Sequence, residues 1–256
     1  MTQNLFLLRE FVRRDFKGRY AGSALGFLWS FVQPLFQLVL FNFVFATVMR
    51  LSPAGERTDN FAIFLFCGLL PWTAFSEGVQ RSSTAITENA TLVKKLNFPS
   101  EILVLATCMA ALLHEGIAAA VFLVILGLFG QLSLAGLPVL LLALPLQIAL
   151  TLGLGLVLSS LQVFFRDTAQ VLGMIFMGWF YMTPIVYPLS LVPETFRPWV
   201  ELNPLTILVG LYREAFLGGT VPWSPHLGWL ALASGVSLVG GLTLFRSLKP
   251  AFADEI

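Results

Sequence analysis

The chain has 256 residues, of which 57% are hydrophobic and only 11% charged, and its formal net charge is +1. A soluble domain of this length carries far more charge on its surface, so the composition excludes a soluble globular protein and indicates a membrane protein. The balanced charge also excludes a nucleic-acid-binding protein, because phosphate recognition needs a concentrated basic surface.

The first predicted element is an amphipathic helix at residues 4–21. Apolar residues recur at spacings of three and four from Leu5 to Tyr20, which places them on one helical face, while basic residues occupy another. This pattern is typical of a helix that lies in the membrane surface instead of crossing it. The pattern allows two interpretations. Either the helix anchors the chain in the membrane and its positive charge sets the orientation of the chain across it, or the helix contacts a partner protein.

A short glycine-containing link leads from this helix into the first apolar run. Gly22 and Gly26 have the GxxxG spacing that permits close approach of two helices, and a simple turn between surface helix and span explains them equally well. Within the run, Gln33, Gln37 and Asn42 either line a polar path or form hydrogen bonds to neighbouring helices.

Six apolar runs are long enough to cross a bilayer. About 20 apolar residues in a helix span the hydrocarbon core, and lipid offers no partner to an unpaired backbone group, so we expect all six to be α-helices. The predicted fold is an all-α membrane protein with six transmembrane helices in a single domain, residues 1–256. The predicted spans are residues 28–48, 61–79, 102–129, 137–165, 168–187 and 227–245.

The basic residues are distributed unequally between the two sides of these spans. Most lie on the side of the N-terminus, whereas Arg50, Arg57, Arg197 and Arg213 lie on the other side. Loops rich in Lys and Arg remain in the cytoplasm. The distribution therefore predicts a multi-pass protein with both termini in the cytoplasm.

Two loops face the cytoplasm in this topology. The longer one, residues 83–98, is predicted to contain a short helix over residues 88–96, which Asn97 and Pro99 would end. It is either a docking surface or a solvated connector whose lysines bind anionic lipid. In the shorter loop, FFRD, we expect Arg166 and Asp167 to pair with each other or to cap the neighbouring helices.

A long proline-rich stretch on the other side precedes the last span. Asn203 is suited to the N-cap of a helix and Pro204 to its first position, and Gly218 and Gly219 stand where this helix would end. The helix is too short to cross the membrane. We therefore predict that residues 193–219 form a re-entrant or interfacial segment that shapes an exit on the outer side.

His114 and Glu115 interrupt the third span with ionisable side chains. Such residues are costly inside a membrane and are therefore functional candidates, and the alternative is a hydrogen-bonded role in helix packing. The sequence HEGIA lacks the second histidine of HExxH, which excludes a zinc protease, and an intramembrane enzyme remains a remote hypothesis. Cys67 and Cys108 lie in apolar segments, where we interpret them as packing residues and expect no metal site.

Several motifs, taken together, resemble a known family of transport proteins. These are RRDFKGRYAGSALGFLWSFVQPL, TLVKKLNFPSEIL, FFRD and NPLTILVGLYREAFLGG. In this order they resemble the permease subunits of type 2 ABC exporters (the ABC-2 family), particularly those that move lipid-linked polysaccharides such as O antigen, capsule or teichoic acid. The likeness covers nearly the whole chain, and none of the motifs is a catalytic signature.

The resemblance implies a homodimeric channel in the bacterial inner or plasma membrane, working with two copies of a separate cytoplasmic ATPase. ATP and Mg²⁺ would be bound by that ATPase, and the absence of a GxxxxGK[ST] phosphate loop here agrees with this division. We accordingly expect a transport subunit that binds no cofactor and is not itself an enzyme. The alternative within transport is an ABC-2 exporter of a small drug or lipid.

The resemblance also implies roles for particular segments. The loop at residues 83–98 would be a coupling helix that docks on the ATPase, the N-terminal helix would be a second contact, and residues 193–219 would be re-entrant helices of the outer leaflet. The residues expected to take part are Glu88, Asn89, Leu92, Lys94, Lys95 and Phe98 in coupling and Arg13, Arg14, Asp15, Lys17, Arg19 and Tyr20 in the surface helix. The candidate pathway or intramembrane polar residues follow from their place in the apolar spans and not from the resemblance. They are Gln33, Gln37, His114 and Glu115.

Overall fold

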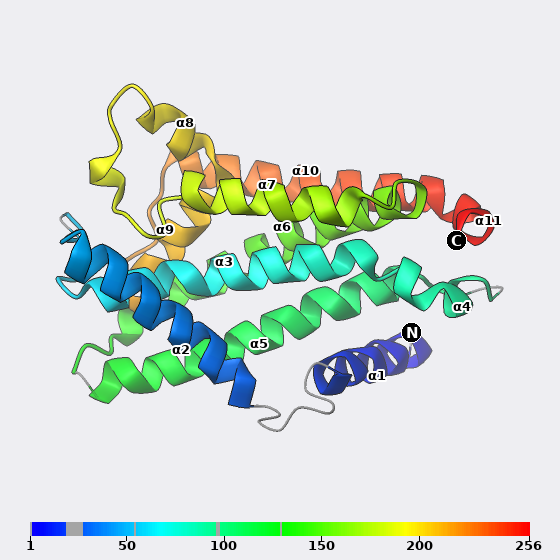
Figure 1. The fold of residues 1–256 in the computed structure, drawn as a ribbon, viewed down its shortest axis with the longest axis horizontal. Helices are drawn as coiled ribbons and strands as arrows, with labels where there is room; N and C mark the ends of the chain where they lie inside the picture. Colours follow the sequence, from blue (N-terminus) through cyan, green and yellow to red (C-terminus); the bar gives the residue numbers. More distant parts are fainter. Residues whose placement is uncertain (1, 19–27, 54, 96–97, 129) are drawn as a thin grey trace.

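The longer helices of the protein run side by side along its long axis, and one shorter helix near the N-terminus, labelled α2 (Trp29–Phe41), crosses them obliquely (Figure 1). The computed structural model describes residues 2–18, 28–53, 55–95, 98–128 and 130–256, and all regular structure in these ranges is helical. The predicted all-α fold is therefore confirmed.

Four helical segments are long and apolar enough to cross a membrane, judged on the described residues. They correspond to the predicted spans 61–79, 102–129, 137–165 and 227–245, although residue 129 lies outside the described part of the chain. The segments are Phe61–Thr84 (α3), Glu101–Leu128 (α5), Leu134–Phe164, which contains η4 (Leu134–Gly136) and α6 (Leu137–Phe164), and Pro225–Glu255, which contains α10 (Pro225–Leu248), η6 (Lys249–Ala251) and α11 (Phe252–Glu255).

The other two predicted spans correspond to shorter apolar helices. The first span, 28–48, is divided into α2 (Trp29–Phe41) and a π-helical segment, η2 (Asn42–Val48). The fifth, 168–187, corresponds to α7 (Thr168–Met182). The predicted count of six spans thus depends on these two shorter helices.

The predicted end of the fifth span at residue 187 was wrong, because α7 ends at Met182. Thr183 has an extended backbone (φ −98°, ψ 131°). Residue 184 is a proline, whose ring disfavours a helical conformation in the residue before it. The hydroxyl of Thr183 donates to the carbonyl oxygen of Trp179 at 2.8 Å and closes the last turn.

The two ends of the bundle carry different elements. At one end, here called the termini end, lie α1 (Thr2–Gly18), η3 (Thr87–Asn89), α4 (Ala90–Val93) and α11 (Figure 1). At the other, the far end, lie η2, η5 (Leu189–Leu191), α8 (Arg197–Leu202) and α9 (Pro204–Phe216). The described part of the predicted helix 4–21 is helical, and residues 19–21, with Gly22 and Gly26, lie outside the described ranges.

The predicted short helix before the last span is present as α9. The side-chain oxygen of Asn203 accepts a hydrogen bond from the backbone N–H of Leu205 at 3.1 Å, so the N-cap prediction is confirmed. At the other end Gly218 has a φ of +73°, a left-handed conformation that glycine adopts without strain. The local sequence therefore fixes both ends of this helix.

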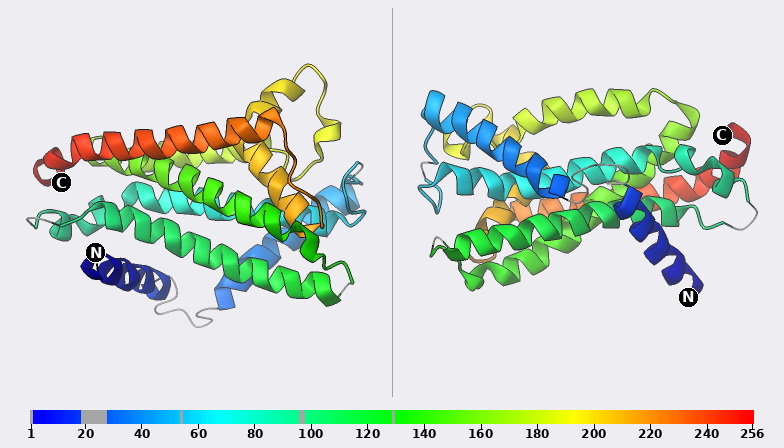
Figure 2. Two further views of the ribbon diagram at one scale, coloured as in Figure 1. Left: turned by 180° about the vertical axis from the view of Figure 1, so that it is seen from behind. Right: turned by 60° about the horizontal axis from the view of Figure 1, so that its bottom comes forward.

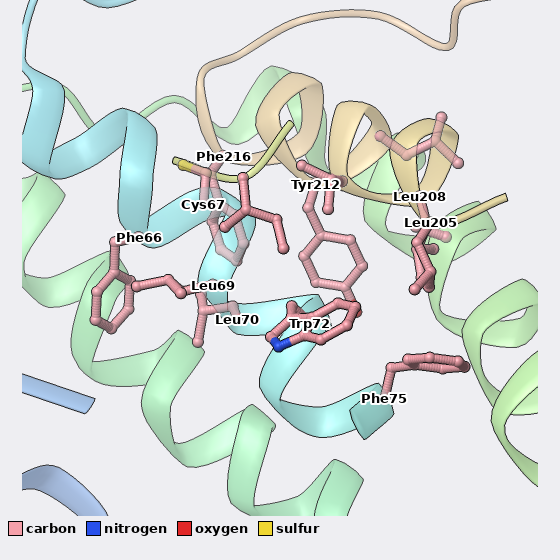
Figure 3. Packing of buried hydrophobic residues seen from close by; sticks show 14 of the residues in the cluster. Phe66, Cys67, Leu69, Leu70, Trp72, Phe75, Leu205, Leu208, Tyr212 and Phe216 are labelled. Atoms are coloured by element: carbon pink, nitrogen blue, oxygen red, sulfur yellow. The ribbon is translucent and has the colours of Figure 1, made fainter. Parts of the chain in front are cut away.

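The largest apolar core lies around α3. Figure 3 shows Tyr212 and Phe216 of α9 directed toward Cys67 and Trp72 of α3, and all four side chains are buried. Cys67 and Cys108 are both free and buried, as predicted for packing residues. This packing attaches α9 firmly to the membrane-spanning bundle.

Helices α6 and α10 approach each other closely, with α6 lying between α5 and α10 when seen from behind (Figure 2). A Cβ atom added to Gly153 would lie 2.3 Å from the backbone carbonyl carbon of Ser237, and one added to Gly241 would lie 2.3 Å from the backbone oxygen of Gly153. Both positions therefore require glycine for the two backbones to pack in direct contact.

Candidate functional site

The predicted coupling loop folds back against the termini end of the bundle. The short helix expected over residues 88–96 is present but ends earlier: the 3-10 helix η3 leads directly into α4, which ends at Val93. The side chain of Asn89 donates to the carbonyl oxygen of Ala85 at 2.9 Å and joins η3 to the turn that follows α3. Ile86 and Val93 are buried and anchor the loop to the bundle.

Helix α1 and the coupling loop, which are far apart in the sequence, are in contact. The guanidinium of Arg14 donates to the side-chain oxygen of Asn89 at 2.7 Å. One residue further on, Asp15 forms an ion pair with Arg81 at 2.5 Å, just before the loop begins. These two polar contacts, here called the α1 clamp, join α1 to the loop and to the end of α3. The clamp borders a cavity of about 230 Å³ between α1, α3 and α5.

The predicted coupling residues divide into an inward group and an outward group. Phe98 packs edge-on against Phe11 of α1, with ring centroids 6.0 Å apart, and Leu92 is partly buried. In contrast, the side chains of Glu88, Lys94 and Lys95 are exposed. The loop therefore holds α1 through Asn89 and Phe98 and presents charged groups to its surroundings. Arg13 is also exposed, whereas Arg19, Tyr20 and the side chain of Lys17 lie outside the described residues.

The shorter loop at this end is held by a residue that the sequence analysis did not identify. The side chain of Gln162 donates to the carbonyl oxygen of Arg166 and accepts from the backbone N–H of Ala169, both at 2.8 Å. Asp167 occupies the N-cap position of α7, but its side chain makes no capping hydrogen bond. The expected capping role of Asp167 was therefore wrong.

A groove of about 290 Å³ runs between α2, α3 and α7. Gln37, for which the sequence left open a polar path or a hydrogen bond between helices, lies in this groove, whereas the side chain of Gln33 lies outside the described residues. Most of the lining was not identified from the sequence, although spacings of three and four place it on one face of each helix. The groove is lined by Gln37 and Phe41, by Trp72, Ser76 and Gln80, and by Gly173, Phe176, Met177, Phe180 and Tyr181.

Aromatic rings form the floor of this groove and fix its shape. Phe176 meets Trp72 edge-on with centroids 5.9 Å apart, and Phe180 stacks on Phe41 at 5.7 Å. Such ring pairs stabilise packing beyond the area they bury. The amide of Gln80 and the ring of Tyr181 are exposed above this floor. The groove thus combines flat apolar surfaces with neutral hydrogen-bonding groups.

Glu115 belongs to a separate polar cluster inside the bundle. Its carboxylate accepts a hydrogen bond from the side chain of Gln147 of α6 at 2.9 Å, and the hydroxyl of Tyr212 of α9 donates to the same Gln147. All three side chains are buried. His114 is only partly buried, and neither it nor Glu115 lines the groove. This arrangement favours the packing interpretation of Glu115, because the cluster joins α5, α6 and α9.

The substitution Gln147→Leu is expected to lower the free energy of unfolding by about 1–3 kcal/mol, because it removes the partner of two buried polar groups. Reversible unfolding of the detergent-solubilised protein, followed by helical circular dichroism, measures the change. The exposed Gln170 provides the control. If Gln147→Leu destabilises the protein no more than Gln170→Leu, the cluster does not stabilise the bundle.

Comparison with known proteins finds similarity to transport permeases over nearly the whole chain. The family model described as ABC-2 type transporter matches residues 7–217. The O-antigen export system permease protein RfbA of Myxococcus xanthus is 32% identical over 252 residues, which cover 98% of this chain and 95% of that protein. RfbA of Klebsiella pneumoniae is also 32% identical, over 97% of this chain and 94% of its own length. The polysialic acid transport protein KpsM of Escherichia coli is 26% identical over 93% and 92%.

Proposed function

The chain belongs to the ABC-2 type transporter family, and from this premise we propose that it is the permease subunit of an ATP-driven exporter of lipid-linked polysaccharide. The observation that carries the proposal is the similarity to O-antigen export permeases over 98% of the chain. O antigen is accordingly the first candidate cargo, followed by capsule and teichoic acid.

We propose that the groove between α2, α3 and α7 is one half of the export path. A sugar ring has apolar C–H faces and hydroxyl groups at its edge, so it suits a surface of aromatic rings with neutral amides and hydroxyls. Trp72, Phe176 and Gln80 offer this combination. In a homodimer, two such grooves facing each other would enclose the chain and complete the channel.

Under the same proposal, two further segments cross the membrane. One is α2 together with η2, and the other is α7. Both are apolar helices beside the long helix α3, and lipid requires such segments to be helical. Six spans place the two chain termini on one side, which the distribution of Lys and Arg assigns to the cytoplasm. The termini end then faces the cytoplasm, and α8 and α9 form the re-entrant segment at the outer surface.

ATP hydrolysis is proposed to act on the permease through the termini end. Exposed Lys94 and Lys95 would dock on a separate ATPase, and the α1 clamp would pass the movement of the loop to α1. ATP can drive the cycle only if it binds one conformation of the ATPase more tightly than the other, and here that conformation is the closed ATPase pair. Closure would shift the two permease copies at their interface and move the glycan between them.

Depletion of the protein tests this function directly. We expect surface polysaccharide to disappear and its lipid-linked precursor to accumulate on the cytoplasmic side, because synthesis continues after export stops. Immunoblotting of surface glycan and mass spectrometry of membrane lipids measure both. Re-expression of the unaltered chain is the control and restores export. Normal surface glycan combined with new drug sensitivity would contradict the proposal and favour a small-molecule exporter.

A further inference from the structure

A cavity of about 870 Å³ lies at the far end of the bundle, apart from the groove and from the α1 clamp. Five parts of the chain meet around it: η2, the connection from η2 to α3, the beginning of α3, the connection after α5, and Leu217 after α9. Its volume falls within the range of about 300–1,000 Å³ that is typical of ligand-binding pockets. In the proposed orientation this far-end pocket faces the outside of the membrane.

The far-end pocket is lined by neutral hydrogen-bonding side chains and apolar side chains in equal number, together with Arg57 and Asp59. Amide side chains come from three separate elements, and apolar contacts are supplied by residues such as Leu51 and Leu217. Amides, hydroxyls and a carboxylate are the groups that exchange hydrogen bonds with sugar hydroxyls. The polar members that carry the argument are Asn42, Ser52, Thr58, Asp59, Asn60 and Gln131.

The charge of the pocket disfavours an anionic ligand. Among the described lining residues the one arginine, Arg57, forms an ion pair with Glu214 at 2.9 Å, which partly offsets its positive charge. Asp59 adds a negative charge to the rim, and its side chain is exposed. A phosphate or an anionic lipid headgroup would meet this carboxylate, and the one cation in the described lining is paired with Glu214. An uncharged polyhydroxyl compound avoids that cost.

One side of the pocket, at residues 57–60, is held by hydrogen bonds and an ion pair before any ligand binds. The side-chain oxygen of Asn60 accepts from the backbone N–H groups of Ala62 and Ile63, and the hydroxyl of Thr58 accepts from the backbone N–H of Asn60. The Arg57–Glu214 pair fastens the same connection to α9. A site that is already ordered loses less conformational entropy on binding. The segment at residues 57–60 therefore needs little further ordering to bind a ligand.

We infer that the far-end pocket binds a saccharide unit of the exported glycan after it leaves the export path. The inference rests on the proposed function, because export supplies the glycan to this side of the membrane. It adds a second sugar site on the outer surface, formed by Asn42, Asn60 and Gln131 and separate from the groove. Such a site would retain the emerging chain and oppose its return.

The experiment uses the full-length protein in detergent and the oligosaccharide that mild acid releases from the same cell's surface polysaccharide. Saturation-transfer NMR and isothermal titration calorimetry measure binding. The variants Asn42→Leu and Gln131→Leu are expected to bind about tenfold more weakly, since each loses hydrogen bonds to the ligand. Gln170→Leu, at an exposed position on α7, is the matched control and should bind as the unaltered protein does. Helical circular dichroism verifies that all variants are folded.

The outcomes separate this inference from the proposed function. Equal binding by the unaltered protein and both pocket variants overturns the pocket while leaving export intact. Competition by inorganic phosphate or by phosphatidylglycerol micelles, at concentrations where a neutral disaccharide has no effect, overturns the saccharide assignment. Surface glycan that persists after depletion of the protein overturns the export function, whatever the binding assay gives. Loss of binding in the pocket variants alone, without phosphate competition, supports the inference.

Discussion

Reversing the charge of the coupling loop with Lys94→Glu and Lys95→Glu is expected to abolish export while the helical bundle remains folded. Both side chains are exposed, so the substitutions leave the packing of the loop unchanged. Ile86 and Val93, which anchor the loop, remain buried. Charge complementarity governs the recognition of a partner surface, and like charges placed opposite each other disfavour binding. The expected cause of failure is therefore loss of docking.

Co-purification of the ATPase and its rate of ATP hydrolysis in liposomes measure this loss. Arg246→Glu is the matched control, because Arg246 is an exposed basic residue in the last turn of α10 at the same end of the bundle. The alternative interpretation, in which the lysines bind anionic lipid, predicts that the effect vanishes in neutral phosphatidylcholine. Unchanged docking and export in the double variant would remove Lys94 and Lys95 from the coupling surface.

The sequence predicted well those parts of the fold that are determined by residues adjacent in the chain. Asn203 followed by Pro204 specified the start of α9, and the glycine at 218 specified its end, because capping and left-handed backbone depend on neighbouring residues alone. The end of α7 had a local signal as well, in the proline at residue 184. The prediction overlooked it because the apolar run continues beyond this proline.

The contacts that define the candidate sites depend on residues far apart in the chain. The residue spacing within α1 does not indicate that Arg14 contacts Asn89. Arginine and asparagine are both common on solvent-exposed surfaces, so neither residue signals a contact. The contact between α6 and α10 likewise joins Gly153 to Gly241, while the GxxxG motif noted in the sequence lies outside the described residues. Sequence patterns assign faces to helices, but the pairing of these faces follows from tertiary packing.

Aromatic composition alone also gave no location for the export path. The chain has 24 phenylalanines and six tryptophans. Such side chains are as common on lipid-facing surfaces and at the membrane interface as they are inside a transport path. What identifies the groove is the convergence of three helix faces that carry Gln37, Trp72 and Phe176. Trp72, Ser76 and Gln80 follow one another at intervals of four, so a helical-face analysis of α3 would have found this part of the lining.

Filling the groove with Gly173→Trp is expected to reduce export to the background level of a strain without the protein. Gly173 lines the groove, and a Cβ atom at this position meets no other heavy atom within 4 Å, so the fold accommodates a side chain there. Glycine inside a helix is destabilising by about 0.5–1 kcal/mol relative to alanine, so the backbone at this position does not depend on glycine. The indole would nevertheless occupy a groove of only about 290 Å³. Blockage of the path, and not unfolding, is the expected reason for the loss.

Gly240→Trp is the matched control, because Gly240 lies on α10 outside the groove and its added Cβ also meets nothing within 4 Å. Surface glycan is measured in both strains, together with co-purification of two differently tagged copies. Loss of export with intact copy pairing and intact ATPase docking would assign the defect to the path itself. Loss of pairing in Gly173→Trp alone would instead assign α7 to the contact between copies. Normal export in Gly173→Trp would show that the glycan passes elsewhere, because an indole at this position leaves no room for a sugar ring in the groove.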